Sequence, residues 1–127
     1  MKILLIDDST LSRTILKRAL GSGHAFVEAG DGMRGLELFF IEKPDLVFLD
    51  LTMPGSNGLD ILEQLRQVDP SARVIVGTAD IQEYSRTKAE ELGAAAYLTK
   101  PFTPEAVQEA VRQATEEMDG TNTGLGR

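Results

Sequence analysis

The feature that most constrains the fold of this chain is a set of short runs made of apolar residues alone, without the alternation of apolar and polar residues that a half-exposed strand shows. Three such runs occupy residues 3–6, 46–49 and 74–76. Strands that are buried on both faces have this pattern, as in parallel sheets covered by helices. Two more mixed runs, at residues 26–27 and 95–98, are expected to form the edge strands. The sequence therefore predicts a five-stranded sheet in the middle of the molecule.

Amphipathic helices are predicted between these runs, because apolar residues recur there at spacings of three and four. The expected apolar faces carry Leu11, Ile15, Leu16 and Leu20; Leu36, Phe39 and Phe40; Leu59, Leu62, Leu65 and Val68; Ile81, Tyr84, the aliphatic stem of Lys88 and Leu92; and Val107, Ala110, Val111, Ala114 and Met118. The first helix follows Ser9-Thr10 and the second is opened by Asp31-Gly32, while Asn57 and Thr103 are placed to cap the third and the fifth. Asp80 and Glu83 resemble a capping box for the remaining helix. Five strands alternating with five helices predict an α/β fold with right-handed crossovers.

Composition excludes several classes of function. The chain has no cysteine, which rules out a disulfide scaffold, a cysteine zinc site and a thiol nucleophile. Its net charge of −7, with no basic run, argues against direct binding of nucleic acid or of an anionic membrane. No apolar run approaches the ~20 residues of a membrane span, and acidic residues come too early for a signal peptide. We expect a cytoplasmic protein.

The 127 residues fit one domain. Residues 1–118 are expected to form it. Residues 119–127 are expected to be a flexible C-terminal tail, because glycines and polar turn-forming residues dominate them.

Polar residues collect at the carboxyl ends of the predicted strands, where open parallel sheets carry their sites. They are Asp7, Asp8, Asp50, Thr78 and Lys100. Two carboxylates about 4 Å apart repel by roughly 4 kcal/mol at an effective dielectric constant near 20, so three at one edge need a cation. Oxygen ligands without His or Cys favour Mg²⁺, or Mn²⁺, over zinc. A lysine and a threonine hydroxyl beside them suit a phosphoryl group. The residues therefore predict a Mg²⁺-assisted phosphoryl site with a carboxylate at its centre.

Four motifs contain these residues: Leu-Ile-Asp-Asp-Ser at 5–9, Leu-Asp-Leu-Thr-Met-Pro-Gly at 49–55, Val-Gly-Thr-Ala at 76–79 and Tyr-Leu-Thr-Lys-Pro-Phe at 97–102. In this order and at these spacings, they resemble the receiver domain of two-component response regulators, the CheY-like superfamily, in its single-domain form. The resemblance extends over about residues 2–118. It implies a doubly wound, flavodoxin-like (βα)5 fold with strand order 2-1-3-4-5.

The resemblance also implies a role for each acidic residue. Asp50 would accept a phosphoryl group from a phosphohistidine on a sensor histidine kinase or a phosphotransfer protein. Asp8 and Asp50 would bind Mg²⁺ directly, Asp7 largely through water, and Thr52 through its backbone carbonyl. Because His24 is the sole histidine and precedes an edge strand, the donor must be another molecule. The protein would be a phosphoacceptor with slow self-dephosphorylation rather than a small-molecule enzyme.

A second group of residues would report phosphorylation, again as the resemblance implies. Lys100 would pair with Asp50 and then with the phosphoryl oxygens. Thr78 would move to bind the phosphoryl group, and Tyr97 would turn inward at the same time. The peptide bond between Lys100 and Pro101 would be cis. The surface of the fourth helix, fifth strand and fifth helix would then contact a downstream effector protein.

Three other functions compete with this interpretation. A phosphatase of the haloacid dehalogenase type wants a second acid two residues after its nucleophile, where this chain has Thr52, and normally has its nucleophile after the first strand. A nucleotide- or flavin-binding module would need a glycine-rich phosphate loop, whereas residues 8–12 contain no glycine. A degenerate receiver that only docks is disfavoured because all five site residues are present.

Some single residues have plainer explanations. Asp7 and Asp8 could cap the first helix, Tyr97 could simply pack at the sheet edge, and Asp80 is better explained as a cap than as a hydrolytic residue. Gly77 stands where the family usually has a larger apolar residue, which leaves a gap or lets backbone approach closely. Whether the chain is a complete receiver or a fragment of a longer regulator stays open.

Overall fold

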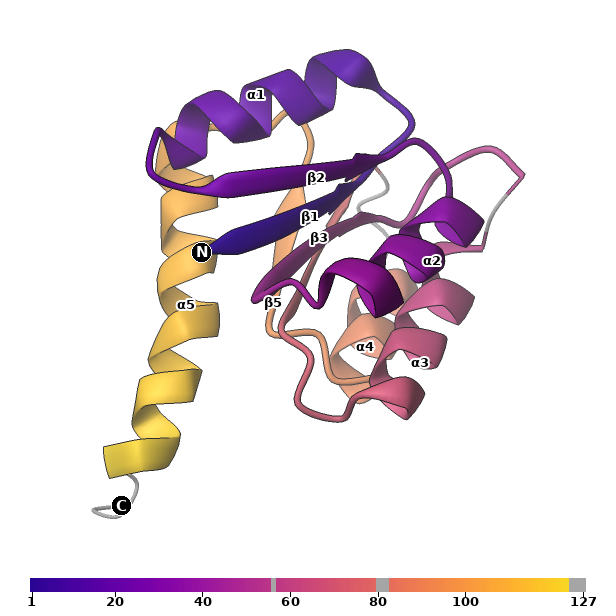
Figure 1. Cartoon of the computed structure of the whole chain (residues 1–127). Helices are drawn as coiled ribbons and strands as arrows, with labels where there is room; N and C mark the ends of the chain where they lie inside the picture. The colour runs from indigo at the N-terminus through magenta and orange to yellow at the C-terminus, as the bar shows by residue number, and fades with distance from the viewer. Residues whose placement is uncertain (56, 80–82, 124–127) are drawn as a thin grey trace.

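A parallel sheet of five strands forms the middle layer of the molecule, in the order β2-β1-β3-β4-β5 (Figure 1). This structure, a computed structural model, describes residues 1–55, 57–79 and 83–123. The strands are β1 (Lys2–Ile6), β2 (Ala25–Ala29), β3 (Leu46–Asp50), β4 (Val74–Thr78) and β5 (Ala96–Thr99). The predicted fold, its strand order and its two edge strands are confirmed.

Helices cover both faces of the sheet (Figure 1). They are α1 (Thr10–Leu20), α2 (Gly32–Glu42), α3 (Gly58–Val68), α4 (Glu83–Glu91) and α5 (Pro104–Thr123). The predicted caps Asn57 and Thr103 are confirmed, since their side chains accept backbone N–H bonds from the first turns of α3 and α5. The side chains of Ser9 and Asp31 cap α1 and α2 in the same way. The predicted cap Asp80 lies outside the described residues, as does Ile81. Among the described residues, no helix has the length and apolarity needed to cross a bilayer.

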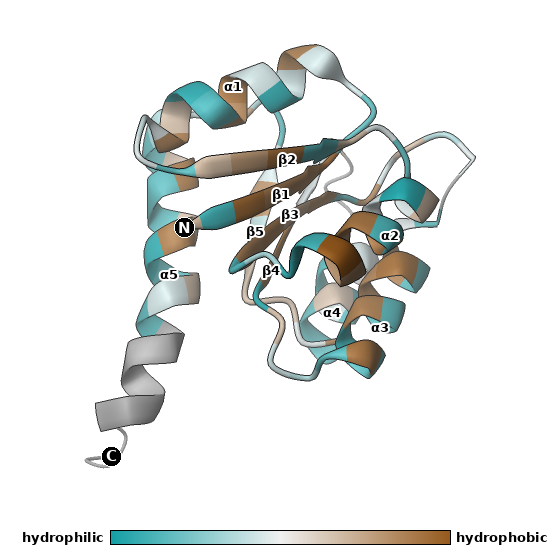
Figure 2. Ribbon diagram, in the orientation of Figure 1, coloured by the Kyte–Doolittle hydropathy of each residue, from teal (hydrophilic) through white to brown (hydrophobic). Residues whose placement is uncertain are grey.

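Alternate residues of the strands enter two separate cores. The ribbons of β1 and β3 are hydrophobic along most of their length (Figure 2). Beneath α1 and α5 lie Ile3, Leu5, Phe48, Ile75 and Leu98. Beneath α2, α3 and α4 lie Leu4, Ile6, Val47, Leu49, Val74 and Val76. Side chains two residues apart on a strand share a face. The residues two positions after Leu5, Phe48, Ile75 and Leu98 therefore lie on the same face of the sheet, beneath α1 and α5, at its carboxyl edge. They are residues 7, 50, 77 and 100.

The last helix is longer than predicted. α5 continues to Thr123, so the first five residues of the predicted tail, 119–123, are helical. The sequence prediction ended the helix where its apolar face ends, but adding a turn to an existing helix costs little. Residues 124–127 lie outside the described residues, and the flexibility of the tail stays a prediction.

The start of α3 approaches the loop after β3 so closely that only glycine fits. A Cβ atom on Gly58 would lie 2.4 Å from the Cα of Leu51. We expect Gly58→Ala to lower the free energy of unfolding by about 1–3 kcal/mol, as for overpacked cores, in urea denaturation. Gly30→Ala is the matched control, because its Cβ would have only a side-chain atom of Arg13 nearby, at 3.9 Å. Equal stability of the two variants would contradict this packing.

Candidate functional site

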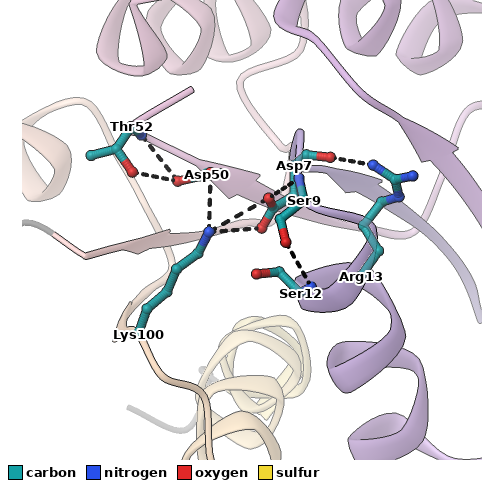
Figure 3. Close-up of polar contacts among 7 residues, drawn as sticks. All are labelled: Asp7, Ser9, Ser12, Arg13, Asp50, Thr52 and Lys100. Carbon is teal, nitrogen blue, oxygen red and sulfur yellow. Dashed lines mark hydrogen bonds and ion pairs between the residues drawn. The ribbon is translucent and has the colours of Figure 1, made fainter. Parts of the chain in front are cut away.

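Asp7, Asp50 and Lys100 meet at the carboxyl edge of the sheet (Figure 3). The Nζ atom of Lys100 lies 3.2 Å from Oδ2 of Asp7 and 3.2 Å from Oδ2 of Asp50. Both carboxylates are buried, with 2% and 4% of the residue exposed. The structure thus contains the Lys100–Asp50 ion pair that the resemblance implied, and it adds a contact to Asp7 that sequence reasoning missed.

One cation, the Lys100 ammonium, is shared by two buried anions, the carboxylates of Asp7 and Asp50. Burial raises the pKa of Asp7, and the charge of Asp50 adds to the rise, although the Ser9 N–H, at 2.9 Å, and Lys100 oppose it. Burial alone would lower the pKa of Lys100, but attraction to Asp7 and Asp50 outweighs burial and raises it. The cluster keeps an excess of negative charge that a further cation would offset.

Asp8 completes a group of three carboxylates. Asp7, Asp8 and Asp50 each offer one oxygen, and these oxygens all lie within 4.8 Å of one another. Asp8 is exposed, so the group opens to solvent on that side. An all-oxygen donor set suits a hard divalent cation such as Mg²⁺ or Mn²⁺. The residues predicted from the sequence as the carboxylate ligands are therefore brought together and could hold a metal ion. We call them, with Lys100, the acidic site.

Thr52 contacts the acidic site through atoms that the sequence prediction did not consider. Its backbone N–H and its hydroxyl both donate to Oδ1 of Asp50, each at 3.0 Å. The two oxygens of Asp50 therefore have different partners, with Thr52 on Oδ1 and Lys100 on Oδ2. A threonine two residues after an aspartate often makes such local bonds, which is the signal that could have revealed them. Metal binding by the Thr52 carbonyl stays a prediction.

Arg13 is another residue that sequence reasoning missed. Its guanidinium donates to the backbone carbonyl of Asp7 and, at 2.8 Å, to Glu28 on the neighbouring strand β2. Lys17 also donates to Glu28 at 2.8 Å. Hydrogen bonds from Lys17 and Arg13 lower the pKa of Glu28. These contacts tie the loop after β1 to α1 and β2, and no local pattern predicts them because Glu28 is distant in sequence.

The predicted switch residues lie on the strands next to Asp50. Thr78 ends β4 and is fully buried. Tyr97, on β5, is half-buried and packs against the α2–α4 core, with the Arg86 guanidinium 5.5 Å from its ring centroid. The bond between Lys100 and Pro101 is cis, as expected. The movements of Thr78 and Tyr97 stay predictions.

Comparison with known proteins agrees with this fold. The family model described as "Response regulator receiver domain" matches residues 3–112. Sporulation initiation phosphotransferase F of Bacillus subtilis is 34% identical over 113 residues, which are 88% of this chain and 91% of that protein. Chemotaxis protein CheY of Thermotoga maritima is 33% identical over 117 residues, 91% of this chain and 98% of that protein.

Solved structures are similar as well. A CheY-like receiver domain protein from Methanospirillum hungatei superposes with a TM-score of 0.86 at 25% identity, covering 94% of this chain and 97% of that one. The CheX-CheY-BeF3-Mg complex from Borrelia burgdorferi gives 0.85 at 27% identity, with 91% and 89% covered. The chain belongs to the family of response regulator receiver domains.

Neutralising Asp7 should stabilise the metal-free protein. A raised pKa in the folded state means that folding favours protonated Asp7, so its ionised form weakens the fold at pH values above that pKa. We expect Asp7→Asn to raise the thermal midpoint in EDTA at neutral pH. The gain should shrink as the pH falls toward 3.8, the ordinary pKa. A lower midpoint for Asp7→Asn at neutral pH would show that the ionised carboxylate stabilises the fold instead.

Magnesium should stabilise the protein through the three carboxylates. A ligand that binds only the folded state at 100 times its Kd adds about 2.7 kcal/mol to the free energy of unfolding. We expect Mg²⁺ to produce such a gain in urea denaturation and Asp8→Asn to lose most of it. Glu63→Gln, which neutralises an exposed carboxylate on α3, should keep the full gain. An undiminished gain in Asp8→Asn would place the ion elsewhere.

Proposed function

We propose that this protein is a phosphorylation-controlled signalling switch in which Asp50 accepts the phosphoryl group. The observation that carries the proposal is the position of the Asp50 carboxylate. It is buried at a strand end, lies 3.2 Å from the Lys100 ammonium, and belongs to the three-carboxylate group. Membership of the receiver family supports this role.

The proposed reaction transfers one phosphoryl group to a carboxylate. An oxygen of Asp50 attacks the phosphorus of a phosphohistidine while the phosphorus–nitrogen bond breaks. The imidazole nitrogen keeps the bonding electrons and takes up a proton, and Asp50 becomes an acyl phosphate. Lys100 offsets charge on the phosphoryl oxygens, and the Thr52 bonds hold the attacking carboxylate in place. Mg²⁺ held by Asp7, Asp8 and Asp50 would supply further charge neutralisation.

The donor is expected to be a separate molecule. His24 directly precedes β2, at the amino edge of the parallel sheet, whereas Asp50 ends β3 at the carboxyl edge. A sensor histidine kinase or a phosphotransfer protein would present the phosphohistidine. One relative is named a phosphotransferase, and a structural relative, CheY of Borrelia burgdorferi, was solved with BeF3 and Mg. Both support phosphoryl chemistry at the acidic site.

The proposed output surface consists of α4, β5 and α5. Side chains of Arg86, Tyr97 and Gln113 border a surface hollow of about 210 Å³ there. Lys100 directly follows β5, so a change at the acidic site can reach this surface through one strand. Moving a two-state population from 1:99 to 99:1 needs about 5.5 kcal/mol, to which a dianion beside Lys100 can contribute. A downstream effector protein would bind the altered surface.

The proposed switch is a phosphoacceptor rather than a small-molecule enzyme: the phosphoryl group stays on Asp50 until water hydrolyses the acyl phosphate, which restores the carboxylate and releases inorganic phosphate. The proposal includes two expectations from the sequence analysis, a non-enzymatic role and a cytoplasmic location.

Phosphorylation should depend on Asp50. We expect the protein to gain the mass of one PO3H group when incubated with acetyl phosphate and Mg²⁺, detected by intact mass spectrometry. Asp50→Asn should gain none, because an amide is a poor nucleophile. Asp60→Asn, at an exposed position at the start of α3, should be phosphorylated like the parent protein. A mass gain in Asp50→Asn equal to the parent's would refute Asp50 as the acceptor.

A further inference from the structure

Gly77 occupies a position beside Asp50 where any larger residue would carry a side chain into the neighbourhood of the acidic site. It pairs with Asp50 of β3 on one side and with Leu98 of β5 on the other. Paired residues of neighbouring parallel strands project to the same face of the sheet. A side chain at position 77 would therefore stand on the α1–α5 face, next to the Asp50 side chain.

The aromatic ring of Phe102 takes that place. A Cβ atom on Gly77 would lie 2.9 Å from Cζ and 3.0 Å from Cε1 of Phe102. Because real Cβ atoms essentially never lie under 3.0 Å from another heavy atom, a side chain at position 77 would require the ring to shift. Phe102 is half-buried and packs against the core beneath α1 and α5. Of the two explanations for Gly77, a gap or a close approach, the structure supports a close approach, made by a ring rather than by backbone.

The ring also borders the acidic site. Phe102, Gly77, Asp7 and Asp50 line a space of about 10 Å³ behind the two carboxylates. The other lining residues are Ile6, Leu16, Phe48 and Leu49. A space of this size is at the lower limit for one water molecule. The space that the ring borders beside Asp7 and Asp50 therefore holds about one water molecule at most.

Phe102 is coupled to Lys100 in two ways. It follows Lys100 by two residues, so the packing of the ring restrains the backbone segment that carries the lysine. The Nζ atom of Lys100 lies 5.8 Å from the ring centroid, within the range of cation–π attraction. A lysine side chain is long and flexible, and this one must keep its ammonium between Asp7 and Asp50.

We propose that Phe102, seated over Gly77, is a positioning residue for Lys100 in the phosphorylation of Asp50. The ring holds the ammonium between the two carboxylates and borders the small space beside them. Gly77 is the counterpart that makes room for the ring. This inference rests on the proposed phosphoryl transfer to Asp50 and adds the residues that set its rate.

The test is a double-mutant cycle on the rate of phosphorylation by acetyl phosphate at saturating Mg²⁺. Gly77→Ala should displace the ring and slow phosphorylation about ten- to hundredfold, the range for small misplacements in active sites. Phe102→Leu alone should slow it several-fold. Adding Gly77→Ala to Phe102→Leu should slow it little further, because the ring atoms that collide are gone. Gly30→Ala, whose Cβ meets nothing closer than 3.9 Å, should match the parent protein.

A spectroscopic readout separates positioning from loss of stability. The ring current of Phe102 should shift the side-chain resonances of Lys100, and this shift should shrink in Gly77→Ala but not in Gly30→Ala. If Gly77→Ala does not fold, the rate of Phe102→Leu decides, and a rate equal to the parent's overturns the proposal. A folded Gly77→Ala that is as fast as the parent, or equally slow with and without Phe102→Leu, also overturns it. A parent protein that is never phosphorylated would instead refute the proposed function itself.

Discussion

The lysine ammonium shared by two buried carboxylates is the interaction on which the rest of the site depends. Burying an ionised carboxylate is costly unless it is paired. Lys100 pairs with Asp7 and Asp50 at once, 3.2 Å from each. Attraction between unit charges about 4 Å apart amounts to roughly 4 kcal/mol at an effective dielectric constant near 20. One such cation makes two buried carboxylates tolerable, but with Asp8 beside them it leaves the edge negative and receptive to a metal ion.

The topology of the sheet explains why these groups meet. Parallel strands end at the same edge, and the order β2-β1-β3-β4-β5 puts the ends of β1 and β3 side by side. The alternation of faces then directs Asp7, Asp50 and Lys100 to the same side as the core beneath α1 and α5. The two apolar cores fix the strands from both faces. Apolar packing, rather than contacts among the polar groups, therefore fixes the strands that hold these groups at one edge.

Patterns local in sequence predicted much of this structure. Unbroken apolar runs predicted β1, β3 and β4, and mixed runs predicted the edge strands β2 and β5. Strand-end position was enough to select Asp7, Asp50 and Lys100 before any geometry was known, and short-range hydrogen-bonding preferences selected caps such as Asn57.

Contacts between distant segments were not predictable in the same way. Nothing local indicates that Arg13 and Lys17 bind Glu28, that Lys100 also reaches Asp7, or that the Phe102 ring lies over Gly77. These contacts depend on which rotamers the packed helices and strands allow. The excess length of α5 was missed for another reason, because helix propagation beyond the packed turns leaves no mark in the apolar pattern.

The central claim is that the charge balance around Asp50 is built to receive a phosphoryl group and a divalent ion together. The most direct measurement is a crystal structure of the protein with Mg²⁺ and beryllium fluoride, a mimic of the phosphoryl group. The account predicts beryllium bonded to an oxygen of Asp50, Lys100 turned from Asp7 toward the fluorides, and the ion on the carboxylates. A structure in which Asp50 carries no beryllium and Lys100 still bridges Asp7 and Asp50 would contradict it.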